Sequence, residues 1–351
     1  MAATQLLPST TRRAGAGLLA AGLVLALLLA LTLAVGLGSV DVPAREVWST
    51  VARHLTGTQG PPGPHDLIVW QLRVPRALLA ALVGAGLGLV GTAVQALVRN
   101  PLADPYLLGI SSGASLGAVA ATVLGVGAGG ALGLGAGAAA FAGALGSFAL
   151  VRLTAGRGSG FSPLRLVLSG IAVGQFLAGL CSYLVLRAGD EQQTRGVLFW
   201  LMGSLGGATW ARLALPAAAV ALGLVALQAR ARALNALVLG DETAAGLGIG
   251  PDRLRRELFL LTSLLTGVLV AVSGAVGFVG LLVPHLCRLA AGGDHRRLLP
   301  LSALTGAVLL TAVDTVARTA LDAQELPIGV VTALLGAPVL LYLLDRRQEN
   351  R

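Results

Sequence analysis

Long runs of apolar residues, separated by short polar stretches, make up most of this chain. Windows of about 20 apolar residues, enough to cross a bilayer as a helix, recur roughly ten times. Because these runs are continuous and do not alternate with polar residues, they predict helices and argue against the strands of a membrane barrel. We therefore expect an all-α fold in which residues 1–351 form one polytopic transmembrane domain. The predicted transmembrane helices are Gly17–Leu37, Ala77–Leu97, Tyr106–Val126, Ala131–Val151, Leu164–Leu186, Leu213–Leu227, Leu258–Val276, Val279–Ala291, Leu298–Ala317 and Ile328–Leu344.

A long polar stretch, NALVLGDETAAGLGIGPDRLRRE, interrupts this pattern at residues 235–257. Because predicted spans flank it on both sides, it must lie in water at one membrane face. Asp241 or Thr243 can cap a short helix, which the glycines that follow can end. We predict a short helix followed by a turn. Composition alone leaves open whether the stretch does more than join two spans.

Two other stretches should break the helical pattern. After the second span, Pro101 and Pro105 terminate helices, and Asn100 and Asp104 can cap the backbone groups at the break. Further on, residues 199–205 read FWLMGSL, which is too short to span a bilayer and aromatic at one end. That segment is typical of a helix lying at the membrane interface.

The composition confirms an integral membrane protein and limits its chemistry. Hydrophobic residues make up 55% of the chain, charged residues 12%, and mean hydropathy is +0.82. All 25 basic residues are arginines. Without lysine, the chain has neither the P-loop lysine that contacts nucleotide phosphates nor a lysine nucleophile. Any ATP chemistry linked to this chain must therefore belong to a partner.

Cysteine and histidine give no reason to expect a metal site. Neither cysteine has a second cysteine at C-x-x-C spacing, and both fall in predicted spans, so they are interpreted as small buried apolar residues. The histidines are scattered without ligand spacing. The residues concerned are Cys181, Cys287, His54, His65, His285 and His295.

Many of the 49 glycines recur at small-xxx-small spacing, which lets helix backbones approach closely in lipid. Such spacing fits a mobile bundle around a pathway as well as ordinary tight packing, and the sequence does not separate the two. The pairs are Gly84/Gly88, Gly113/Gly117, Gly125/Gly129 and Gly170/Gly174.

The arginine distribution predicts an orientation. With ten spans and a cytoplasmic N-terminus, most of the 25 arginines fall on the cytoplasmic side, as the positive-inside rule requires. This arrangement places residues 235–257 and both termini in the cytoplasm. It places Arg73, Arg76 and Arg318 at the external face of the cytoplasmic (plasma or inner) membrane. Asp314 and Arg318, four residues apart, share one helical face and can offset each other's charge.

Several runs resemble the FecCD-type permeases of iron-siderophore and vitamin B12 ABC importers. The most specific is QxxxRNPLADPxxLGISSGA, from Gln95 to Ala114. A second is GxxxFVGLxxPHxxR, from Gly274 to Arg288, and a third is ELPIGVVT with GAP after it. The run WLMGSL resembles the siderophore permeases in particular. The signature residues are Arg99, Asn100, Pro101, Asp104, Pro105, Gly109, Gly113, Gly280, Pro284, His285, Arg288, Asp314, Glu325, Pro327 and Gly329.

The resemblance implies a bundle like that of the vitamin B12 importer permease and an ATPase-coupling role for part of the polar stretch. In the family this segment docks into a groove of the ATP-hydrolysing subunit. The matching residues are Leu239, Gly240, Asp241, Glu242, Thr243, Ala244, Leu247, Gly248 and Ile249. The external arginines Arg73, Arg76 and Arg318 would meet acidic residues of an extracytoplasmic substrate-binding protein. Exposed ion pairs of this kind contribute about 0.2–1 kcal/mol each and so orient docking.

The expected function is therefore that of an importer permease with no catalytic residue and no cofactor of its own. Its partners would be a dimer of ATPase subunits carrying ATP-Mg, a second permease copy or similar subunit, the binding protein and membrane lipid, and no nucleic acid. The cargo would be a ferric siderophore or a related chelate such as haem or cobalamin, moved by alternating access. A secondary, ion-coupled transporter is the alternative, but such carriers place ionisable residues in mid-span, where this chain has almost none. A membrane-embedded enzyme is disfavoured because no cluster of catalytic groups is present.

Overall fold

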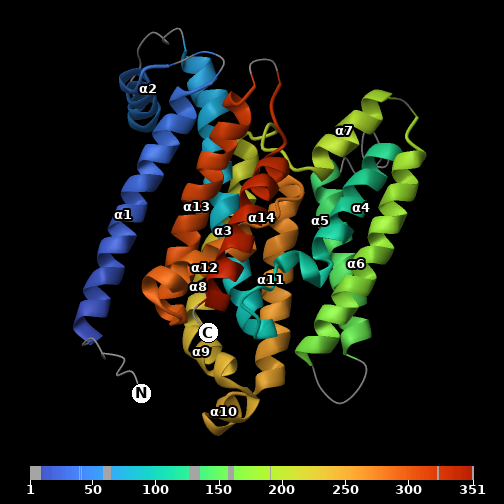
Figure 1. The fold of residues 1–351 in the computed structure, drawn as a ribbon. Coiled ribbons are helices and arrows are strands. Elements are labelled where there is room, and N and C mark those ends of the chain that lie inside the picture. The colour runs from blue at the N-terminus through green and yellow to red at the C-terminus, as the bar shows by residue number, and fades with distance from the viewer. Residues whose placement is uncertain are drawn as a thin grey trace.

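The computed structural model describes residues 9–38, 40, 42–57, 65–125, 135–156, 162–189, 191–321 and 324–349. Within these ranges the chain folds into helices and contains no strand, which confirms the all-α prediction (Figure 1). The elements are α1 (Ser9–Gly36), α2 (Ala44–Thr56), η1 (Ile68–Arg73), α3 (Val74–Val98), η2 (Pro105–Leu108), α4 (Ile110–Val123), α5 (Ala136–Ala155), α6 (Pro163–Leu186), α7 (Glu191–Leu201), α8 (Trp210–Ala229), α9 (Ala231–Leu239), α10 (Asp241–Gly246), α11 (Pro251–Ser273), α12 (Val279–Ala291), α13 (His295–Thr319) and α14 (Ile328–Glu349).

The apolar helices of the described ranges correspond to the predicted spans. Seven are long enough to cross a membrane: the Gly15–Gly36 part of α1, η1 with α3, α5, α6, α8, α11 and α13. Three shorter apolar helices, α4, α12 and the Ile328–Tyr342 part of α14, take the remaining positions. The predicted start of the third span at Tyr106 is wrong, because Gly109, with φ of +74°, separates η2 from α4. The predicted start of the fourth span, Ala131, lies outside the described residues.

Helix α3 forms the centre of the bundle. Most of its side chains between Ala77 and Leu97 are buried, and it packs against α8, α11, α12 and α13. In Figure 1, α1 stands on one side of this core, and α4, α5, α6 and α7 stand on the other. A helix that is apolar all round is stable at such a position because every face meets another helix.

Glycines allow α3 and α13 to touch through their backbones. A methyl group at Gly84 would overlap the carbonyl oxygen of Gly306, and one at Gly88 would overlap that of Ser302. Gly113 and Gly117 of α4 approach α5 in the same way. The glycine spacing therefore provides close helix packing at Gly84/Gly88 and Gly113/Gly117, whereas nothing lies within 4 Å of a methyl group at Gly125. Of the predicted pairs, Gly129 lies outside the described residues.

The break after α3 is capped as predicted. Asn100 accepts a hydrogen bond from the backbone of Leu102 at 2.9 Å, and Asp104 accepts one from Tyr106 at 2.8 Å. Pro105 then packs against Gly280 at the start of α12, where an added Cβ would lie 2.8 Å from the proline ring. Two signature segments that are far apart in the sequence therefore meet in the core.

The predicted interfacial helix has different limits. Helix α7 begins at Glu191 and ends at Leu201, so the last four residues of the predicted segment form a loop. Gly203 has φ of +81°, which ends the helix, and Ser204 donates its backbone N–H to the carbonyl of Ser273 at 2.9 Å. This bond ties the loop after α7 to the end of α11.

Candidate coupling segment and arginine cluster

The polar stretch forms a helical hairpin at one end of the bundle. Helices α9 and α10 project from the same end at which α1 begins (Figure 1). Gly240, with φ of +123°, separates the two helices, and the backbone N–H of Ile249 closes the turn after α10 by bonding to Ala244. The predicted short helix and turn are confirmed, although both flanks of residues 235–257 belong to α9 and α11. The tip exposes Leu239 and Leu247, at 71% and 66%.

Asp241 connects this tip to two helices of the bundle. Its carboxylate pairs with Arg255 of α11, whose side chain is only 3% exposed. The same oxygen lies 3.4 Å from Nη1 of Arg99, the residue that ends α3 in a left-handed conformation. Arg255 also lies 3.5 Å from Asp252 of its own helix, so its buried charge faces two carboxylates, of which Asp241 is the one that belongs to α10. Glu242, in contrast, is exposed on the same short helix.

A second connection joins α9 to the start of α13. Asn235 donates to Asp294 at 2.7 Å and accepts from the backbone N–H of His295 at 2.9 Å. Burial acts to raise the pKa of Asp294, but the hydrogen bonds from Asn235 and from the Arg296 backbone outweigh it and hold that pKa below its usual value. Asp294 therefore stays ionised and keeps the connection at neutral pH. Nothing in the sequence shows that Asn235 and Asp294 meet, so this connection could not be predicted from it.

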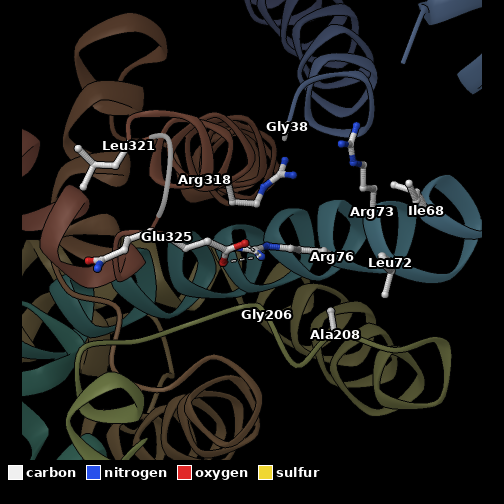
Figure 2. A pocket seen from close by; sticks show the side chains of 11 residues that line it. Gly38, Ile68, Leu72, Arg73, Arg76, Gly206, Ala208, Arg318, Leu321 and Glu325 are labelled. Carbon is white, nitrogen blue, oxygen red and sulfur yellow. Dashed lines mark hydrogen bonds and ion pairs between the residues drawn. The ribbon is translucent and has the colours of Figure 1, made fainter. Parts of the chain in front are cut away.

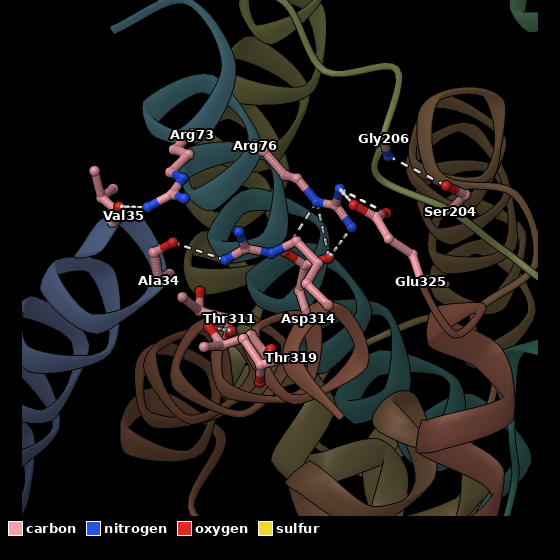
Figure 3. Close-up of polar contacts among 12 residues, drawn as sticks. Ala34, Val35, Arg73, Arg76, Ser204, Gly206, Thr311, Asp314, Thr319 and Glu325 are labelled. Carbon is pink, nitrogen blue, oxygen red and sulfur yellow. Dashed lines mark hydrogen bonds and ion pairs between the residues drawn. The ribbon is translucent and has the colours of Figure 1, made fainter. Parts of the chain in front are cut away.

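At the opposite end of the bundle, five charged residues form what we call the arginine cluster: Arg73, Arg76, Asp314, Arg318 and Glu325. The Arg73 guanidinium donates to the carbonyls of Val35 and Gly36, at the end of α1, at 2.9 and 3.0 Å, and to that of Val40 at 2.6 Å. Figure 3 shows Arg73 beside Val35. A cation is favourable there because the last carbonyls of a helix have no partners within it.

Asp314 lies at the centre of the cluster. It accepts from Nε and Nη2 of Arg76 at 3.0–3.2 Å and lies 3.2 Å from Nε of Arg318, so the predicted pairing of Asp314 with Arg318 is confirmed. Nη1 of Arg76 reaches both oxygens of Glu325, at 2.8 and 3.0 Å, and Nη2 of Arg318 donates to the carbonyl of Ala34 at 2.7 Å. Figure 3 shows Arg76 between the two carboxylates.

The cluster borders a cavity of about 490 Å³, shown in Figure 2. The arginine cluster, with three arginines and two carboxylates, has a formal charge of +1, and all of its members except Asp314 line the cavity. The arginines were expected to be exposed, yet the side chains of Arg76 and Arg318 are 13% and 9% exposed and Arg73 is buried. Their role in docking a binding protein stays a prediction, and any docking partner must compete with contacts inside the chain.

The remaining signature residues shape the core. Pro284 and His285 are buried within α12, and a methyl group at Gly329 would overlap the carbonyl oxygen of Met202. The two cysteines are buried, Cys181 on α6 and Cys287 on α12. Among the described residues, no group of three or more His, Cys, Asp or Glu side chains could hold a metal ion.

Comparison with known proteins gives a consistent assignment. Residues 25–346 match the FecCD transport family. The chain is 44% identical to the cobalamin import system permease protein BtuC of Halobacterium salinarum, over 82% of this chain and 76% of that protein. It is 40% identical to the hemin transport system permease protein HmuU of Yersinia pestis, over 94% of this chain and 96% of that protein.

A solved structure of an inward-facing metal-chelate type ABC transporter has the same fold. It aligns with a TM-score of 0.81 and 31% identity, over 93% of this chain and 98% of that chain. The family match covers most of the chain and confirms the resemblance that the signature runs indicated. In this family the permease is one subunit of an ABC importer, and ATP hydrolysis belongs to a separate subunit. The chain therefore belongs to the FecCD transport family and is a membrane permease subunit of an ABC importer.

Proposed function

We propose that this permease carries a large metal chelate, namely a ferric siderophore, haem or cobalamin, into the cytoplasm by alternating access. The observation that carries the proposal is the α9–α10 hairpin, which has an exposed apolar tip and is joined to the helical bundle at two places. Such a hairpin can transmit force from a partner because it is anchored to several helices at once.

Coupling would begin where an ATPase subunit, with ATP-Mg bound, grips residues 239–249. Movement of the hairpin would pass through Asp241 to Arg99 at the end of α3 and to Arg255 on α11. It would pass through Asn235 to the start of α13. Two permease copies, or this one with a similar subunit, would enclose the pathway. Each permease subunit would be moved by an ATPase subunit through its own α9–α10 hairpin.

The substrate class is supported by relatives and by one motif. The two relatives described above are named for hemin and cobalamin import. The run WLMGSL, which resembles the siderophore permeases, lies at the end of α7 and in the loop that follows it. All of these substrates are large chelates, so uptake measurements have to distinguish among them.

In the proposed orientation, the α9–α10 hairpin lies in the cytoplasm of the cell, together with both termini, and the arginine cluster faces outward. The positive-inside rule supports this orientation. The cluster would then dock an extracytoplasmic binding protein through its net positive charge, with an acidic surface on the partner. Membrane lipid surrounds the exposed leucines of α1, among them Leu25 and Leu29.

The ion-coupled alternative finds little support in the cluster itself. A coupling carboxylate must be able to release and rebind its ion. Asp314 instead is held by two arginines near the end of its helix. Nothing in the described residues favours a gradient-driven cycle over an ATP-driven one.

The coupling role is tested by co-purification of the ATPase subunit with a permease carrying Leu239→Glu. A charge on the apolar tip should abolish ATPase capture, while the same change at the equally exposed Leu55 of α2, at the other end of the bundle, should leave it intact. Equal capture by both variants would refute the assignment of the tip.

The cargo is tested by uptake into vesicles that contain this chain, its ATPase and its binding protein. Radiolabelled ferric siderophore, haem and cobalamin are offered separately. We expect ATP-dependent accumulation of one of them, and its loss in Asp241→Asn. The matched control is Glu191→Gln, which removes an exposed carboxylate that pairs with Arg195 of its own helix, at 2.6 Å. If none of the three accumulates, the proposed substrate class is wrong.

A further inference from the structure

The three arginines of the cluster differ in how easily their partners can leave. Arg73 is held by backbone carbonyls at the end of α1, and Arg318 by the Ala34 carbonyl and by Asp314. Asp314 is only 2% exposed. These partners are backbone carbonyls near the end of α1 and one buried carboxylate. Arg76, in contrast, pairs with a carboxylate that already faces solvent, because Glu325 is 47% exposed.

The two carboxylates hold different edges of the Arg76 guanidinium. Asp314 takes Nε and Nη2, and Glu325 takes Nη1 (Figure 3). If Glu325 swung away, Asp314 would still fix the position of the guanidinium. The freed Nη1 would then point a preorganised donor at the cavity, where an incoming carboxylate could accept it. The formal charge of the cluster would remain +1, but the Glu325 carboxylate would no longer occupy Nη1 of Arg76.

Glu325 also lies beside the contacts that hold the start of α14. The next residue, Leu326, donates its backbone N–H to Ala317 of α13 at 2.9 Å. Ile328 donates to Gly203 at 3.1 Å and Gly329 to Met202 at 3.0 Å, in the loop that follows α7. The position of the Glu325 side chain therefore bears directly on the segment that joins α13, α14 and the α7–α8 loop.

We propose that Glu325 is an internal placeholder for a carboxylate of the extracytoplasmic binding protein. On docking, the partner's carboxylate replaces Glu325 on Nη1 of Arg76, and the displaced Glu325 loosens the start of α14. This inference rests on the docking role proposed above, and it adds a competing residue and a route from docking to a transmembrane helix. Competition of this kind keeps the Arg76 guanidinium paired in the free permease and makes docking weaker than the arginines alone would allow.

The test is the affinity of the binding protein for the permease with its ATPase in lipid nanodiscs, with the binding protein immobilised. Glu325→Gln should dock about three- to tenfold more tightly than the parent, because a neutral amide competes poorly for a guanidinium. Glu325→Asp, which keeps the charge on a shorter side chain, should fall between the two. Glu191→Gln should match the parent, since that carboxylate lies on α7 outside the cluster.

A double-mutant cycle shows whether the effect passes through Arg76. Arg76→Gln should weaken docking, and adding Glu325→Gln to it should give no gain. If the parent docks and Glu325→Gln docks equally or more weakly, the placeholder role is wrong while the docking role stands. If the parent fails to dock at all, the docking role is wrong and the placeholder role is overturned with it. A gain that persists in the Arg76→Gln background would also overturn it.

Discussion

Replacing Asp314 by asparagine should destabilise the permease strongly. Asp314 is 2% exposed and pairs with both Arg76 and Arg318, whose side chains are 13% and 9% exposed. Breaking a buried ion pair by removing one partner typically costs about 3–5 kcal/mol. Because Arg76 keeps Glu325 and Arg318 keeps the Ala34 carbonyl, we place Asp314→Asn near the low end, at about 3 kcal/mol. That energy shifts the unfolding equilibrium by about two powers of ten.

Reversible unfolding of the purified permease by SDS in mixed micelles, followed by circular dichroism, measures this cost. The control Glu191→Gln should change the free energy of unfolding by less than about 0.5 kcal/mol, because its ion pair is exposed. Adding Arg318→Met to Asp314→Asn should recover part of the loss, since it removes one uncompensated charge. An Asp314→Asn variant as stable as the parent would show that the cluster is not an electrostatic unit.

Three further results are expected. Gly88→Ala presses a methyl group of α3 against the backbone of α13 and should cost about 1–3 kcal/mol in the same unfolding assay. The control Gly22→Ala, on the open face of α1, should be neutral or slightly stabilising. Equal effects of the two changes would contradict the close α3–α13 contact. Asn235→Ala removes hydrogen bonds at the start of α13 and should lower the free energy of unfolding by about 1–3 kcal/mol. It should also lower the amount of chelate taken up per ATP hydrolysed. An unchanged ratio of uptake to hydrolysis would show that α13 is not part of the proposed route. Cys181 and Cys287 are buried, so maleimide should label them only after SDS unfolding, and rapid labelling of the folded protein would contradict their positions.

The bundle itself could be predicted from the sequence because length and apolarity alone decide which segments span a membrane. The ten predicted spans all correspond to apolar helices, and the i, i+4 spacing of Asp314 and Arg318 predicted their contact. Helix limits were less predictable where a single backbone conformation decides them. Gly109 and Gly203, both with positive φ, moved the start of α4 and the end of α7 away from the predicted residues.

Contacts between distant segments could not be predicted. Arg76 and Glu325 are separated by 249 positions, so nothing in the local pattern shows that they form a pair. Arg99 was recognised only as part of a signature run, and its approach to Asp241 depends on how α3 ends beside α10. The sequence predicted that Arg73, Arg76 and Arg318 lie at the same end of the bundle, and the structure brings them together. Their partners inside the chain, which the sequence does not reveal, decide how accessible each guanidinium is to a docking protein.

The central claim is that ATP, and not an ion gradient, drives import through this permease. The most direct measurement is chelate accumulation in vesicles containing the permease, its ATPase and its binding protein, with ATP inside and the proton and sodium gradients abolished by ionophores. We predict that accumulation continues under these conditions and stops when internal ATP is replaced by ADP. Accumulation that survives without ATP and collapses with the ionophores would contradict the account.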